Sequence, residues 1–156
     1  MSRRPSTLVA LPLSFFIAFL LVALPLPQAI SYWRPELVMM VLVFWVLNEP
    51  GKVGVWTAFT LGLLLDVLMA TTFGVHPLML AVIAYLTRLS YRWVTIFSLW
   101  QTGGLVFSLV LAGLIVKRIL LGILGEGTDS LLYWAPALTS ALVWPTVMFA
   151  LRRFTR

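Results

Sequence analysis

The chain has no cysteine among its 156 residues, and only 10% of its residues are charged, whereas 62% are hydrophobic. The absence of cysteine excludes disulfides, thiolate metal sites and cysteine catalysis. The low charge excludes an ordinary soluble domain, in which about 25% of residues are charged. What remains is a series of long apolar stretches separated by short polar breaks. This pattern indicates a single polytopic membrane domain over residues 1–156.

Enzyme motifs are missing as well. The chain has one histidine, which cannot build a metal site by itself. No serine or threonine stands in a histidine-and-acid arrangement, and the glycines of residues 122–127 lack the lysine and hydroxyl of a phosphate-binding loop. The remaining pair of nearby carboxylates, Glu126 and Asp129, lies in a predicted loop. We therefore expect no catalysis, no metal and no cofactor.

The net charge of +6 raises the question of nucleic-acid binding. The basic residues, however, stand singly or in pairs at the ends of apolar stretches. That distribution is typical of membrane orientation. A nucleic-acid-binding protein instead concentrates its basic residues in a patch or stripe. We expect membrane lipid, and no nucleic acid, as a partner.

The apolar stretches predict an all-α bundle of six transmembrane helices. Their approximate limits are residues 8–24, 35–48, 53–70, 73–88, 93–116 and 131–151. A crossing needs about 20 residues, so the second and fourth stretches are short. Only Thr71 and Thr72 separate the third stretch from the fourth, and five crossings is the alternative. The first stretch also has the pattern of a signal peptide, but the rest of the chain is equally hydrophobic, so we expect an uncleaved helix.

The distribution of lysine and arginine predicts that both termini are cytoplasmic. With the N-terminus inside, eight basic residues face the cytoplasm and three face outward, as expected from positive-inside sorting. The inner eight are Arg3, Arg4, Lys52, Arg88, Arg92, Arg152, Arg153 and Arg156. The longest loop, residues 117–130, then faces outward. Its charged residues, candidates for contact with a partner, are Lys117, Arg118, Glu126 and Asp129.

Asp66 is the first candidate for a functional position, since it interrupts an apolar run. A carboxylate in mid-membrane costs about 2.5–3.5 kcal/mol and needs a partner. Arg34 and His76 are predicted to lie at the same outer end, so we expect an Arg34–Asp66 ion pair with His76 beside it. The cluster is either a structural lock or a site for a ligand or proton, and the lock is favoured. Glu36 follows a proline at the start of the second stretch, where it is expected to cap the helix.

Small residues repeat at a spacing of four in two of the predicted helices. Gly62, Asp66 and Ala70 share one face, so a neighbouring helix can approach closely beside the aspartate. The second series is Gly104, Ser108 and Ala112. Packing inside the bundle is favoured for this series over an interface with a partner.

Three segments taken together resemble the MreD family. They are Arg34-Pro35-Glu36-Leu37, then Gly62 followed four residues later by Asp66, then Gly74-Val75-His76. The resemblance covers roughly residues 32–90, and the later helices agree in length and hydrophobicity. Glu36 stands where the family often has aspartate, and Pro77 where a small residue is more usual.

The resemblance implies a non-enzymatic scaffold of the bacterial inner membrane that works in cell elongation. Such proteins bind MreC, and through it are linked to MreB and to the glycan polymerase and transpeptidase that build lateral peptidoglycan. The implied fold is a compact six-helix bundle similar to the substrate-binding subunits of energy-coupling vitamin transporters. The family's distinctive positions here are Arg34, Pro35, Glu36, Gly62, Asp66, Gly74 and His76, and none is assigned catalysis. The resemblance does not decide whether the chain also associates with copies of itself.

The rival interpretation is a small-molecule binding subunit of a transporter. It needs a concave pocket with converging polar groups. Beyond the cluster already named, the sequence offers Thr71 and Thr72. An ion or proton channel is a weaker third interpretation, because the fifth stretch supplies few polar residues to line a path. These are Gln101, Thr102 and Ser108.

Overall fold

The structure is a computed structural model that describes residues 5–155 except 26, 32, 95 and 128–129. Within this part of the chain the regular elements are helices, with no strand. In order they are α1 (Pro5–Ala23), α2 (Gln28–Ser31), α3 (Leu37–Asn48), α4 (Val55–Met69), α5 (Val75–Val94), α6 (Leu99–Ile123), the 3-10 helix η1 (Leu131–Trp134) and α7 (Ala135–Thr155). Each of the predicted apolar stretches overlaps one of the long helices, while the short α2 was not predicted.

The predicted limits of the fourth and fifth helices are wrong by several residues. The fourth stretch was expected to end at residue 88, but α5 continues to Val94, so Arg88 and Arg92 lie within a helix. The fifth was expected to start at residue 93, but α6 starts at Leu99 and ends at Ile123. A side-chain cap explains the later start, because the backbone N–H of Ser98 donates to Oε1 of Gln101 at 2.9 Å.

Helix α3 lies at the centre of the bundle. All residues from 38 to 46 are buried, and α1, α5, α6 and α7 contact it. Such burial on every side fits a helix that is apolar all round. With 12 residues, α3 is about 18 Å long, well short of the hydrocarbon thickness of about 30 Å. Of the polar residues beside its ends, Glu36 is half-buried and Asn48 is exposed.

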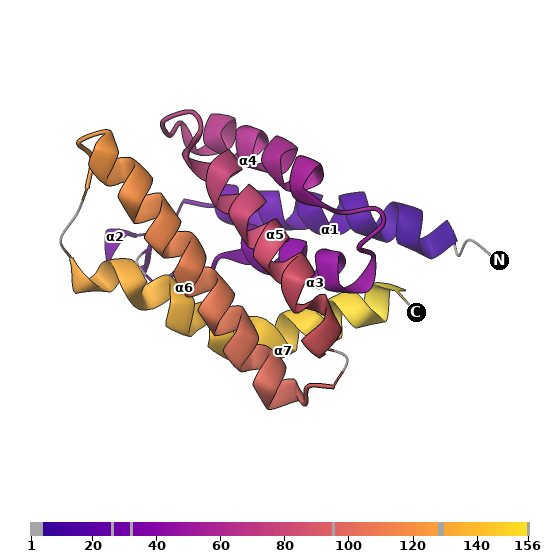
Figure 1. Ribbon diagram of the computed structural model, residues 1–156. Helices are drawn as coiled ribbons and strands as arrows, with labels where there is room; N and C mark the ends of the chain where they lie inside the picture. Colours follow the sequence, from indigo (N-terminus) through magenta and orange to yellow (C-terminus); the bar gives the residue numbers. More distant parts are fainter. Residues whose placement is uncertain (1–4, 26, 32, 95, 128–129, 156) are drawn as a thin grey trace.

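Both chain ends lie at one end of the bundle, as Figure 1 shows. We call this the terminal end. The opposite end carries the tight turn between α4 and α5 and the connection between α6 and α7 (Figure 1). We call it the hairpin end.

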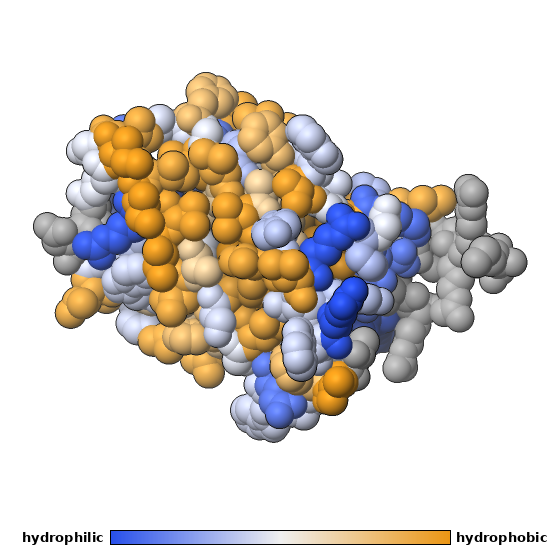
Figure 2. Space-filling view, in the orientation of Figure 1, coloured by the Kyte–Doolittle hydropathy of each residue, from blue (hydrophilic) through white to orange (hydrophobic). Residues whose placement is uncertain are grey.

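The surface is that of a membrane protein. Hydrophobic residues dominate the middle of the face in Figure 2, and hydrophilic ones gather mainly toward the terminal end. Among the described residues, two stretches are long and apolar enough to cross a membrane, Leu99–Ile123 and Leu131–Arg153. Trp56, Trp93 and Trp100 are 85%, 65% and 89% exposed, and all three lie at helix ends on the terminal side. Exposed tryptophans in such a ring are typical of a membrane interface.

Helices α4 and α5 touch through a glycine. A Cβ atom on Gly62 would lie 2.4 Å from both the backbone nitrogen and the Cα of Pro77. No side chain fits there unless the backbone of one helix moves. The close approach expected from the spacing of Gly62 and Asp66 is therefore found in the α4–α5 contact.

The second small-residue series does not pack inside the bundle, contrary to expectation. Gly104 and Ser108 are exposed on α6 and Ala112 is half-buried; nothing lies within 4 Å of a Cβ placed on Gly104. The glycine of α6 that faces the core is Gly113, where a Cβ would meet the side chains of Met39 and Ile83. Spacing alone identified a shared face but not the direction in which it points.

We expect Gly62→Ala to lower the free energy of unfolding by about 1–3 kcal/mol, because the added methyl group forces two backbones apart. Gly104→Ala is the matched control. It adds the same methyl group in open space within a helix, and is expected to be neutral or to stabilise by up to about 1 kcal/mol. Denaturant or thermal unfolding of the purified variants in detergent measures both. Equal stability of the two variants would contradict the close α4–α5 contact.

Candidate functional site

The carboxylate of Asp66 is fully buried and accepts four hydrogen bonds from the turn that follows α4. Oδ1 lies 2.6 Å from Nδ1 of His76 and 3.3 Å from the backbone nitrogen of the same residue. It also accepts from the hydroxyl of Thr71 at 3.1 Å. Oδ2 accepts from the backbone N–H of Gly74 at 2.8 Å. The turn thus supplies the donors that a buried carboxylate requires.

The local sequence explains why the chain wraps around Asp66. Helix α4 ends in a Schellman motif, in which Thr71 N–H donates to the carbonyl of Asp66 at 3.1 Å and Ala70 N–H to that of Val67 at 3.4 Å. Ala70 has φ of 50° and Gly74 φ of 103°. Gly74 adopts a positive φ without a steric penalty. For Ala70 the left-handed conformation costs about 1–2 kcal/mol. The hydrogen bonds to Asp66 offset that strain.

Arg34 does not pair with Asp66, so this prediction is wrong. Its Nη2 donates to the carbonyl oxygens of Leu21 at 2.9 Å and of Leu24 at 2.5 Å. The guanidinium therefore satisfies carbonyls at the C-terminal end of α1, where a positive charge is also favoured by the helix dipole. Asp66 needs no arginine, because its own turn already occupies both carboxylate oxygens.

Glu36 does not cap α3 through its side chain, contrary to expectation. It stands at the N-cap position without a side-chain capping bond. Its backbone N–H instead donates to Oγ of Ser140 at 3.0 Å, which ties the start of α3 to α7. Ser140 is completely buried. The sequence offered no sign of this bond beyond a hydroxyl within an apolar run.

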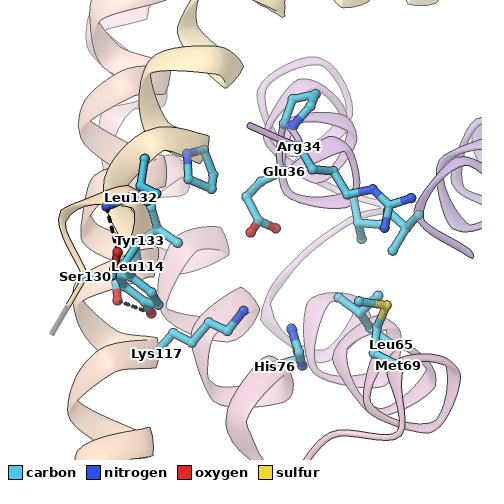
Figure 3. A pocket seen from close by; sticks show the side chains of 14 residues that line it. Arg34, Glu36, Leu65, Met69, His76, Leu114, Lys117, Ser130, Leu132 and Tyr133 are labelled. Carbon is cyan, nitrogen blue, oxygen red and sulfur yellow. Dashed lines mark hydrogen bonds between the residues drawn. The ribbon is translucent and has the colours of Figure 1, made fainter. Parts of the chain in front are cut away.

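A cavity of about 490 Å³ opens at the hairpin end. Every long helix contributes to its lining, which includes Arg34, Pro35, Glu36, Leu65, His76, Lys117 and Tyr133. Figure 3 shows the carboxylate of Glu36, the ammonium of Lys117 and the ring of His76 around this space. Tyr133 also joins two helical elements, because its hydroxyl donates to the carbonyl of Leu114 at 3.0 Å. The role of Tyr133 in the cavity was not predicted.

The four residues proposed to meet a partner through the outer loop do not act alike. Lys117 belongs to α6 and faces the cavity. Arg118 is also in α6, and its guanidinium lies 5.7 Å from the ring centre of Trp134, within the range of a cation–π contact. Glu126 accepts from the hydroxyl of Thr72 at 3.2 and 3.3 Å, which joins the two connections of the hairpin end. Asp129 lies outside the described residues.

A second cavity, of about 510 Å³, opens at the terminal end and is lined by Asn48, Tyr91 and Arg152 among others. Between the two cavities, Met39, Met40, Leu42 and Val43 of α3 are 0% exposed. This packed core separates the cavities, so the structure offers no support for the channel interpretation. Among the residues that the structure describes, no group of three histidine, cysteine, aspartate or glutamate side chains is placed to hold a metal ion.

We expect Asp66→Asn to lower the free energy of unfolding by about 1–3 kcal/mol, the usual cost of leaving buried donors without their acceptor. The asparagine side chain replaces one acceptor oxygen with an NH2 donor. At least one group that donates to the carboxylate in the wild type is then left without an acceptor. Glu49→Gln is the control, since it removes the charge from an exposed pair in which Glu49 and Lys52 are 3.5 Å apart. That change should stay within about 1 kcal/mol. Unfolding in detergent measures both, and similar stabilities would exclude a lock at Asp66.

Comparison with known proteins agrees with the sequence segments noted above. The family model described as rod shape-determining protein MreD matches residues 2–154. The rod shape-determining protein MreD of Haemophilus influenzae is 33% identical over 148 residues, which make up 92% of this chain and 90% of the relative. No solved structure matches the chain. The chain belongs to the MreD family of rod shape-determining membrane proteins.

Proposed function

We propose that the chain is a non-enzymatic scaffold of the bacterial inner membrane that binds MreC and helps to organise lateral peptidoglycan synthesis. Family membership over nearly the whole chain carries this proposal. The hydrogen bonds of Asp66 support it, because both oxygens of the buried carboxylate bond to residues of its own fold. Through MreC the scaffold would be linked to MreB and to the glycan polymerase and transpeptidase pair.

The proposed topology has six crossings and both termini in the cytoplasm. The common location of the two chain ends supports an even number of crossings (Figure 1). The terminal end also carries the basic residues Arg92, Arg152 and Arg153 in the last turns of α5 and α7. Such an excess of basic residues is typical of the cytoplasmic side of a membrane protein. The short helices α3 and α4 would then cross within a bundle rather than alone.

The exposed apolar surface supplies room for the single membrane helix of a bitopic partner. The outward face of α6 with Gly104 and Ser108 is one part of this surface where a helix backbone can approach closely. Arg118 and Glu126 lie at the hairpin end, where the partner would continue into the periplasm. Helix packing and these outer charges together would hold the partner.

The test is co-purification of the wild-type chain with a tagged MreC-type partner from membranes. We expect a stable complex that survives detergent extraction. Ser108→Trp is expected to reduce capture of the partner at least several-fold without lowering Tm, because it fills the outward face of α6. Leu142→Trp adds a comparable bulk at an exposed position of α7 and serves as the matched control.

Failure of the folded wild type to capture the partner would contradict the proposed function. Loss of capture by both tryptophan variants, or by neither, would instead contradict the assignment of the α6 face while leaving the scaffold role standing.

The hairpin-end cavity favours a second candidate function, the substrate-binding subunit of a membrane transporter. Its volume falls within the range of about 300–1,000 Å³ found for small-molecule sites. A water-soluble molecule that co-purifies in stoichiometric amount with the isolated chain would favour this candidate over the scaffold.

A further inference from the structure

The hairpin-end cavity holds charges of both signs that the fold does not neutralise. Lys117 and Glu36 point into the space from α6 and from the start of α3 (Figure 3). Among the described residues, neither side chain makes an ion pair or a hydrogen bond. Both are half-buried. Charged groups inside a membrane bundle are costly unless they are paired or solvated, and they mark binding sites.

Arg34 adds a second positive group to the lining. One of its terminal nitrogens is held by the α1 carbonyls, and this fixes the guanidinium at the rim. Figure 3 shows that this guanidinium points toward α1 and away from Lys117. An anionic group in the cavity would therefore meet Lys117, while a cationic group would meet Glu36.

The remaining walls are apolar. They include Val22, Val38, Leu65, Met69, Leu114 and Leu132. A ligand that fits must therefore combine a compact zwitterionic group with hydrocarbon. The cavity lies at the end of the bundle, where the proposed topology puts the phosphate level of the outer leaflet.

We propose that this cavity binds a headgroup that carries both a phosphate and a primary ammonium, the chemistry of phosphoethanolamine. The phosphate lies against Lys117, and the ammonium donates to the carboxylate of Glu36. Basic pockets between transmembrane helices are known lipid-headgroup sites, and charge-assisted bonds of this kind are strong. The inference rests on the proposed membrane placement but not on MreC binding, so a lipid assay and the co-purification fail independently.

The test uses delipidated protein in detergent, to which three lipids with identical acyl chains are added. They are phosphatidylethanolamine, phosphatidylcholine and phosphatidylglycerol, and native mass spectrometry measures the bound fraction. We expect one phosphatidylethanolamine per chain to bind most tightly. Phosphatidylcholine binds more weakly, because its quaternary ammonium has no N–H to donate to Glu36. Phosphatidylglycerol binds more weakly because it has no cation.

Variants test the assignment of each charge. Lys117→Met should weaken phosphatidylethanolamine binding about tenfold to a hundredfold, the loss of one charge-assisted bond. Glu36→Gln should abolish the preference for phosphatidylethanolamine over phosphatidylglycerol, even where its overall affinity changes little. Lys52→Met, which removes an exposed cation of the α3–α4 connection, should bind like the wild type. Tm of each variant confirms that it is folded.

Competition with soluble glycerophosphoethanolamine distinguishes the source of the headgroup. Displacement only at concentrations far above that of the lipid supports a membrane lipid, and displacement at equal concentration supports a soluble ligand of the same chemistry. Equal binding of the three lipids by the wild type would overturn the proposal. So would folded Lys117→Met and Glu36→Gln proteins that bind and discriminate like the wild type.

Discussion

The carboxylate of Asp66 holds the α4–α5 turn closed, and the shape of the hairpin end depends on it. Its hydrogen bonds fix Thr71, Gly74 and His76 relative to the end of α4. Because His76 lies in the first turn of α5, the same bonds set where α5 begins and bring Pro77 onto Gly62. His76 in turn forms part of the cavity wall. A single buried carboxyl group thus connects the end of one helix, the packing of two helices and the shape of the hairpin-end cavity.

The short central helix is the second constraint. Helix α3 is buried over residues 38–46 and is shorter than a membrane is thick. Each end faces a cavity, with Glu36 on one side and Asn48 on the other. The methionine and aliphatic side chains between them are fully packed. This arrangement suits a rigid body that presents two separate surfaces rather than a conduit between them.

The apolar stretches were sufficient to predict a helical membrane bundle, because each stretch overlaps one long helix. Gly62 and Asp66 were also correctly placed on a face where a neighbouring helix approaches closely, since a spacing of four defines a helix face. The hydrogen-bond partners of Arg34 could not be predicted, because a sequence shows that an arginine is present but not how far it lies from Asp66 or from the carbonyls of α1. The orientation of α6 could not be predicted either, since residue spacing does not show whether Gly104 or Gly113 faces the core. The end of α5 was missed because Arg88 was read as a boundary, although no glycine or proline interrupts residues 78–94.

A double-mutant cycle on Asp66 and His76 tests the central claim most directly. Asp66→Ala, His76→Ala and the double variant would be compared with the wild type by reversible unfolding in mixed micelles. The account predicts strongly non-additive losses, with a coupling energy of about 1–3 kcal/mol, as expected for two residues in one buried network. Additive losses would show that the two side chains stabilise the protein independently, and would contradict a hairpin end held by the Asp66 carboxylate.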